Sequence, residues 1–295
     1  MIQQLAAILL PVFFITGLGY FWSKLGMPLE RNSVTSLVLN VATPCLVLDS
    51  VSKLTLPVSE FYTMLASAVA LFVGAAVLGV VLLRIFDLPA LSFLPSLTFG
   101  NAGNMGLPLC LFAFGNPGLG LAAAVLLVAV VTQFTLAPML QDRRPALTAL
   151  LTTPVVYGSA IGVFLLVTNL RLPVWLDTTV GLLAGVAIPL SLLTLGFSLA
   201  ELKIAHARIS ISLGAARLAI GFGVALAVAE IFGLEGVSRG VLIIQGGMPT
   251  ALVCYLFSAR YDRHPDDVAG IVLVSTLLSA ALLPFLISFA LITSR

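Results

Sequence analysis

The sequence predicts an all-α integral membrane protein with about ten transmembrane helices in two inverted five-helix repeats, in which the fourth and ninth helices are broken. Three observations predict it. Of the 295 residues, 60% are hydrophobic and only 9% are charged, and the mean hydropathy is +1.17. Short polar segments divide the chain into apolar stretches of about 20 residues, the length that crosses a bilayer. Two of these stretches are interrupted at matching places in the two halves.

Nine connecting segments set the number and orientation of the helices. Nine connections imply ten helices, so both termini lie on the same side. The connections on the opposite side hold nine basic residues, against four on the terminal side, which predicts both termini outside the cytoplasm of the cell (inner) membrane. The apolar N-terminus lacks a basic region and a cleavage site, so we expect a retained first span. The connections are residues 24–31, 49–60, 84–89, 115–118, 141–145, 169–177, 201–208, 233–239 and 260–267.

An internal repeat follows from the spacing of prolines. Because each half then contains an odd number of helices, the second half must enter the membrane inverted relative to the first. We expect a first repeat over residues 1–140, a short cytoplasmic loop over 141–146 and a second repeat over 147–295. Five proline pairs lie 141 to 146 residues apart: Pro11 and Pro154, Pro28 and Pro173, Pro44 and Pro189, Pro108 and Pro249, Pro138 and Pro284.

The two interruptions are the predicted substrate site. They read Asn101-Ala-Gly-Asn-Met-Gly-Leu-Pro108 and Gln245-Gly-Gly-Met-Pro-Thr250. Unwound backbone survives in a bilayer only where it lines a cavity, and the free N–H groups of half-helix N-termini attract anions. Amide side chains add donors, glycines allow close approach, and the two methionines would contact an apolar body. The candidate residues here are Asn101, Gly103, Asn104, Met105, Pro108, Gln245, Gly247, Met248 and Pro249.

A proline also stands in the second helix of each predicted repeat. Asn40, Thr43 and Pro44 in the first half, and Pro189 in the second, could line the opposite wall of the same cavity. Plain helix kinks are an equally good interpretation, because proline is common in membrane helices.

Ionisable residues are few within the spans. No acidic pair lies at mid-membrane, which disfavours a proton exchanger built on buried carboxylates. We interpret Arg217 as a side chain that snorkels to the cytoplasmic interface, with attraction of anions as the alternative. The three cysteines lie apart and have no metal-ligand spacing, so we expect no metal and no cofactor. The net charge of +2 gives no reason to expect a nucleic-acid partner.

At these residues the sequence resembles the auxin efflux carrier family, the bacterial relatives of the plant PIN proteins. The resemblance is carried by residues 101–109, 194–200, 247–251 and 259–266. It implies the fold that bile acid symporters share with NhaA. It also implies a scaffold of helices 1, 2, 6 and 7, a transport domain of helices 3–5 and 8–10, a homodimer, and elevator-type alternating access for an organic anion.

The expected function is therefore secondary active or potential-driven transport of a small organic anion, such as a carboxylate or an auxin-like acid. The coupling ion, a proton or Na⁺, is left open, since neutral oxygen ligands for sodium are available at the breaks. A sodium-coupled symporter resembling the bile acid carriers is the nearest alternative. A membrane receptor without transport and an intramembrane enzyme are others, although the spans lack histidine and an HExxH-type motif.

Overall fold

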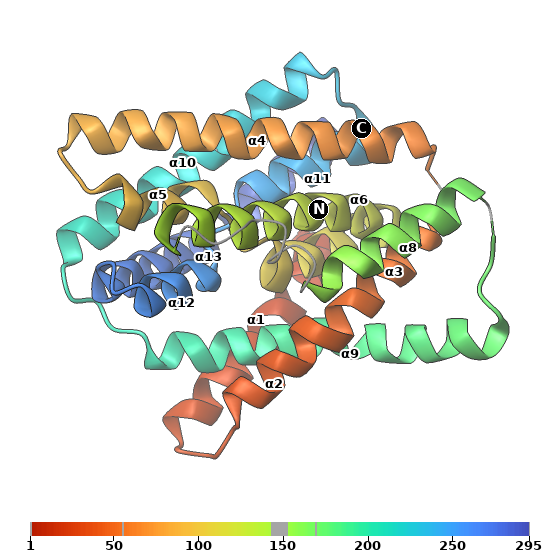
Figure 1. Ribbon diagram of the computed structural model, residues 1–295, viewed down its shortest axis with the longest axis horizontal. Coiled ribbons are helices and arrows are strands. Elements are labelled where there is room, and N and C mark those ends of the chain that lie inside the picture. The colour runs from red at the N-terminus through yellow and green to blue at the C-terminus, as the bar shows by residue number, and fades with distance from the viewer. Residues whose placement is uncertain (1, 55, 143–152, 169, 295) are drawn as a thin grey trace. The chain divides into compact units, whose positions relative to one another are not determined.

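Helices make up all the regular elements in the described part of the chain, which confirms the predicted all-α class. The computed structural model describes residues 2–54, 56–142, 153–168 and 170–294 (Figure 1). The elements are α1 (Ile2–Lys24), α2 (Arg31–Leu37), η1 (Val38–Ala42), α3 (Thr43–Ser52), α4 (Val58–Ile85), α5 (Ala90–Thr98), η2 (Ala102–Gly106), α6 (Leu107–Asp142), α8 (Pro154–Thr168), α9 (Val174–Glu201), α10 (Ala207–Ile231), α11 (Gly236–Gly246), α12 (Leu252–Arg260) and α13 (Pro265–Thr293).

Seven helical stretches of the described residues are long and apolar enough to cross a membrane, which confirms an integral membrane protein. Helix α8 is apolar but shorter, and α5, α11 and α12 each have only 9 to 11 residues. Ten helices in inverted repeats stay a prediction. Most of the predicted central loop lies outside the described residues. The seven stretches are Gln3–Lys24, Ser33–Ser52, Val58–Ile85, Ala102–Gln133, Val174–Glu201, Ala207–Ile231 and Pro265–Thr293.

The chain forms two compact units. We call Met1–Leu5, Leu65–Ala102 and Leu202–Arg295 the first unit, and Ala6–Met64 with Gly103–Glu201 the second unit. Each unit combines residues from both predicted repeats, so neither is a repeat by itself. The predicted division into scaffold and transport domain remains a prediction.

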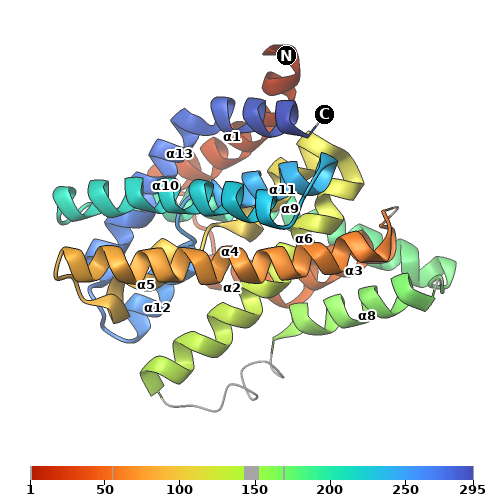
Figure 2. The same cartoon turned by 90° about the horizontal axis from the view of Figure 1, so that it is seen from above.

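Close helix contacts in the first unit run through small residues. Helix α10 packs along α13 and α11, and α5 contacts α10, α12 and α13 (Figures 1 and 2). A Cβ on Gly214 of α10 would lie 3.2 Å from the backbone nitrogen of Ser275 in α13. Such small residues let membrane helices approach closely enough for dispersion contacts to hold them together.

The second unit uses the same device. Gly196 of α9 faces the carbonyl oxygen of Thr16 in α1, and Gly19 of α1 faces that of Leu193, with no room for a side chain at either glycine. Helix α3 packs on α8 and α9, and Gly158 of α8 lies against the Pro44 carbonyl. These contacts involve backbone atoms and glycines, and no charged side chain takes part in them.

The first break is shorter than predicted. Helix α5 ends at Thr98, Phe99 is extended, and π-helix η2 begins already at Ala102, directly before α6. The expectation of unwound chain as far as Pro108 is therefore wrong. Pro108 is the second residue of α6, and η2 precedes α6 without a gap, so Pro108 lies inside a continuous helical stretch that begins at Ala102 and does not break it.

The other interruptions that the sequence predicts agree with the structure to different degrees. The second break is close to its expected place, because α11 ends at Gly246 and α12 begins at Leu252. Pro44 lies in the first turn of α3, directly after the π-helical turn η1, whereas α9 continues through Pro189 without interruption. The connection expected at 115–118 is a kink within α6, where Gly115 has a φ of 66°.

Candidate functional site

The two breaks meet in the first unit as a short antiparallel crossing. The Asn101 N–H donates to the Pro249 carbonyl over 2.7 Å, and the Ala251 N–H donates to the Phe99 carbonyl over 3.0 Å. Between these two bonds, Gly100 and Thr250 form an isolated β-bridge. Two extended segments thus satisfy each other's backbone groups, as a low-dielectric surrounding requires.

Each of the last four backbone carbonyls of α5 accepts a hydrogen bond. The last four carbonyls of a helix have no partner within it. Here the Ser96 carbonyl accepts the Thr250 hydroxyl over 3.0 Å, and the Pro95 carbonyl accepts the Cys254 thiol over 3.4 Å and the Phe99 N–H over 2.9 Å. The carbonyls that remain, those of Leu97 and Thr98, both accept hydrogen bonds from Arg217.

Arg217 of α10 lies at the centre of this arrangement. Its Nη1 donates to the Leu97 and Thr98 carbonyls over 3.0 and 3.2 Å, and its Nη2 donates to the Gly246 carbonyl over 3.4 Å. The side chain is only 2% exposed. The interpretation that Arg217 snorkels to the interface is therefore wrong, because the guanidinium joins the carbonyl ends of α5 and α11.

Two glycines leave the space that the guanidinium occupies, and a third lets α11 approach α10 closely. A Cβ on Gly100 would collide with Nη2 of Arg217, and one on Gly221 would lie 3.1 Å from Nη1. Gly221 also faces the Gly246 carbonyl, and Gly246 faces Ala225 and Gly221 in return, with no room for a methyl group at either glycine. The first break, α10 and α11 each contribute one of these glycines.

The charges at the crossing nearly balance. Each helix C-terminus is equivalent to about −0.5 elementary charge, so the two carbonyl ends together offset one guanidinium. No carboxylate of the described residues forms an ion pair with Arg217. The start of α12 lies beside the crossing, and no side chain caps it, so its positive end is additional. The sum is a slight excess of positive charge.

Several buried polar atoms here have no hydrogen-bond partner among the described residues. They include Nδ2 of Asn101, Nε of Arg217, Oγ1 of Thr98 and Oγ of Ser96. Asn101 is 5% exposed. Buried donors of this kind are rare in folded proteins, and a cluster of them is explained most simply by a ligand or by water.

The predicted site residues divide between the two units. Asn101, Gln245, Gly247, Met248 and Pro249 are buried in the first unit, around the crossing. The second unit contains the others. Of these, Met105, Pro108 and Thr43 are buried, Gly103, Asn104 and Pro44 are half-buried, and Asn40 and Pro189 are exposed. Asn40 uses its Nδ2 to donate to the Ser36 hydroxyl over 3.0 Å, and η1 packs on α9, the helix of Pro189.

An apolar cavity of about 320 Å³ adjoins the second break in the first unit. Leu218 and Phe222 of α10 line it together with Leu282 and Phe285 of α13, and Gly247 forms part of its wall. The hydroxyl of Ser279 in this wall is buried and has no partner among the described residues. The cavity offers an apolar surface next to the crossing.

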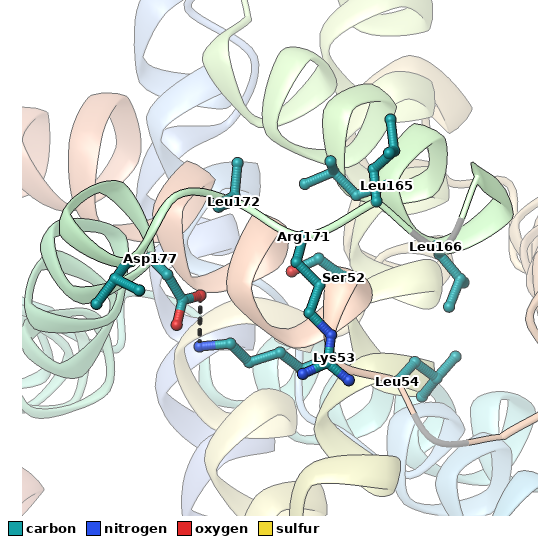
Figure 3. Close-up of a pocket in the computed structure, with 10 residues that line it drawn as sticks. Ser52, Lys53, Leu54, Leu165, Leu166, Arg171, Leu172 and Asp177 are labelled. Carbon is teal, nitrogen blue, oxygen red and sulfur yellow. Dashed lines mark ion pairs between the residues drawn. The ribbon is translucent and has the colours of Figure 1, made fainter.

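A larger cavity, of about 600 Å³, lies in the second unit and is lined by charged groups (Figure 3). Lys53, at the end of α3, pairs with Asp49 over 2.7 Å and with Asp177 of α9 over 2.9 Å. Arg171 lines the same cavity and forms no ion pair among the described residues. When Asp49 is counted with the lining residues, because it pairs with Lys53, two cations and two carboxylates balance here.

Lys53 should make the second unit sensitive to alkaline pH. Its hydrogen bonds with Asp49 and Asp177 raise the pKa of Lys53 above its ordinary value of 10.5. The stability it contributes is therefore fully present below the ordinary pKa and is lost as the pH rises through the raised one. We expect Lys53→Met to lower the melting temperature by a constant amount near neutral pH, and the difference from wild type to shrink at strongly alkaline pH.

The matched control is Arg171→Met, which removes a cation of the same cavity that has no ion pair among the described residues. The difference in melting temperature between Arg171→Met and wild type should not vary with pH. Thermal melts of the detergent-purified variants across the alkaline range measure both. A Lys53→Met difference that persists unchanged at the highest pH would contradict the assignment.

Comparison with known proteins decides the family. A family model described as "Membrane transport protein" matches residues 5–149 and 142–287, nearly the whole chain. The chain belongs to this family. Its resemblance to the auxin efflux carriers is confirmed, and the protein is a membrane transporter rather than an enzyme.

Three relatives are similar to this transporter. An uncharacterized transporter of Methanocaldococcus jannaschii is 22% identical over 296 residues, which cover 92% of this chain and 94% of that protein. One from Methanothermobacter thermautotrophicus is 26% identical over 292 residues, with 93% and 95% coverage. Auxin efflux carrier component 1 of Arabidopsis thaliana is 25% identical over 114 residues, covering 38% of this chain and 18% of that protein.

Sequence reasoning missed Arg217 as a member of the crossing. The signal that could have found it is Gly221, one helical turn later on the same face of α10. A glycine beside a charged residue in a span indicates that another backbone approaches closely there.

Proposed function

We propose that this transporter carries a small organic anion, such as a carboxylate, bound at the crossing of its two broken helices. The observation that carries the proposal is the slight positive excess at a buried site. One guanidinium balances two helix C-termini, and the uncapped start of α12 adds a further positive end. In a low-dielectric interior, such an excess favours an anion far more than it would in water.

The donors for the anion are the unpartnered groups of the first unit. The Asn101 amide is buried, and its Nδ2 has no partner among the described residues, so it is available to a carboxylate. The first N–H groups of α12 are the natural second contact, since helix N-termini bind anions. The second break directly precedes α12 in the chain, and it includes the predicted site residues Gln245, Gly247, Met248 and Pro249. Gly103, Asn104, Met105 and Pro108 follow Asn101 and remain proposed members of the site.

The cavity beside Gly247 suits the apolar part of the substrate. Its volume of about 320 Å³ is in the range of a small ring or a short alkyl chain. An anion with an apolar body would place its charge at the crossing and its body between α10 and α13. A weak aromatic or branched carboxylate, an auxin-like acid among them, has this shape.

The mechanism proposed with this site is elevator-type alternating access in a homodimer of the cell membrane. Of the ten helices predicted from the sequence, counted in chain order, the third to fifth and the eighth to tenth would move as the transport domain. The first, second, sixth and seventh would form the scaffold. The wall residues Asn40, Thr43, Pro44 and Pro189 would face the site from that scaffold. Both termini would lie outside the cytoplasm.

Uptake into proteoliposomes tests the proposal. Purified protein is reconstituted, a membrane potential is imposed, and the accumulation of radiolabelled aliphatic and aromatic carboxylates is measured against protein-free vesicles. We expect saturable, potential-dependent flux of at least one carboxylate. Flux of organic cations or neutral solutes alone, or no flux of any organic anion, would refute the proposed function.

A further inference from the structure

We propose that the guanidinium of Arg217 occupies the position of a coupling cation at the crossing, so that this carrier works without sodium. The inference deepens the proposed function and rests on it for its meaning in transport. The placement of Arg217 between these carbonyls, where a metal cation would otherwise bind, is argued from residues of the first unit only.

The carbonyl oxygens that Arg217 binds are those a sodium ion would need. Sodium is a hard cation and takes neutral or anionic oxygen ligands. The carbonyls of Leu97, Thr98 and Gly246 converge from two helix ends, and all three are within 3.0 to 3.4 Å of guanidinium nitrogens. A cation that enters this position must first displace Arg217.

The charge balance at the crossing also indicates one cation at this position, not two. Two buried helix C-termini, each equivalent to about −0.5 charge, require roughly one positive charge for compensation. A bound Na⁺ or a fixed guanidinium each supplies it, whereas both together would leave an uncompensated charge in the site before the anion binds. The planar guanidinium has five donors, and its two Nη atoms reach both helix ends at once, which an ammonium group does less well.

The surrounding glycines are specific to this arrangement. Gly100 and Gly221 both border the guanidinium: a methyl group on Gly100 would overlap Nη2, and one on Gly221 would crowd Nη1. The site is therefore shaped for an arginine side chain, and the arginine is one of the largest fully buried side chains of the chain's described part.

Thermal stability of the purified wild type gives the first test. A ligand that binds only the folded state raises the melting temperature with its concentration. We expect equal melting temperatures in sodium, potassium and choline chloride at equal ionic strength, and uptake that does not change when sodium is replaced by choline. A sodium-specific rise in melting temperature would overturn the proposal, even if no transported anion has been found.

Chemical rescue gives the second test. Arg217→Ala empties the position and should lower the melting temperature by about 5 °C or more, because three buried carbonyls lose their donors. Millimolar guanidinium chloride, far below denaturing concentrations, should restore part of this loss, and potassium chloride should not. Arg208→Ala, at an exposed position on the same helix, is the control and should show no rescue.

The two tests separate the possible failures. Absence of guanidinium rescue in a folded Arg217→Ala protein would overturn the assignment of Arg217 as the cation between the helix ends. If that variant does not fold, the sodium and choline comparison on the wild type decides alone. Absence of anion flux with unaltered melting results would refute the proposed function but leave the cation assignment in place.

Discussion

Replacing Gly221 by alanine should be among the most damaging single-methyl changes in the transporter. The added Cβ would overlap the Gly246 carbonyl oxygen and lie 3.1 Å from Nη1 of Arg217. Backbone cannot rotate away as a side chain can, so α11 must shift and withdraw a carbonyl from the guanidinium. Overpacking of this kind costs about 1–3 kcal/mol, and the melting temperature should fall by roughly 5 °C.

Gly223 of the same helix provides the matched control. A Cβ there meets nothing within 4 Å, and the residue is exposed. Alanine is a better helix former than glycine, so Gly223→Ala should leave the melting temperature unchanged or raise it slightly. Melts of both variants in one detergent make the comparison. Equal behaviour of the two alanines would mean that α10 does not approach α11 as closely as the structure has it.

The sequence was sufficient for the all-α membrane class and for the place where two breaks meet. Hydropathy alone requires a membrane protein, because so few charged residues cannot cover a soluble fold of this size. The near-constant spacing of the prolines, Pro108 and Pro249 among them, matched one break to the other. The structure then pairs Gly100 with Thr250, close to both predicted interruptions.

The sequence was insufficient where a residue's role depends on its partners. Pro108 favours a break when it is considered by itself, but here the helical stretch that begins at Ala102 continues through it. The snorkelling interpretation of Arg217 used only its distance along the chain from the end of its helix. That distance does not indicate which backbone groups of other helices lie close to its side chain. Its three acceptors come from residues 97, 98 and 246, all of them backbone carbonyls, which no side-chain pattern can indicate.

The largest functional effect is expected at Asn101, where stability and transport should respond in opposite directions. Its main-chain N–H binds the Pro249 carbonyl and survives in Asn101→Ala, so the crossing stays intact. Its Nδ2 is buried without a partner among the described residues, so removing it relieves an unfavourable burial. We expect an unchanged or higher melting temperature.

Transport should nevertheless weaken in the same variant. A hydrogen bond to a charged group contributes about 1.5–3 kcal/mol, which corresponds to roughly a 10- to 100-fold rise in the half-saturating anion concentration. Thr16→Val is the control, since Thr16 Oγ1 is also buried without a partner among the described residues but belongs to the second unit. Its uptake should stay normal. A stable Asn101→Ala protein with unaltered half-saturation would mean that the amide serves the fold alone, and that the anion is held by α12 and the field of Arg217.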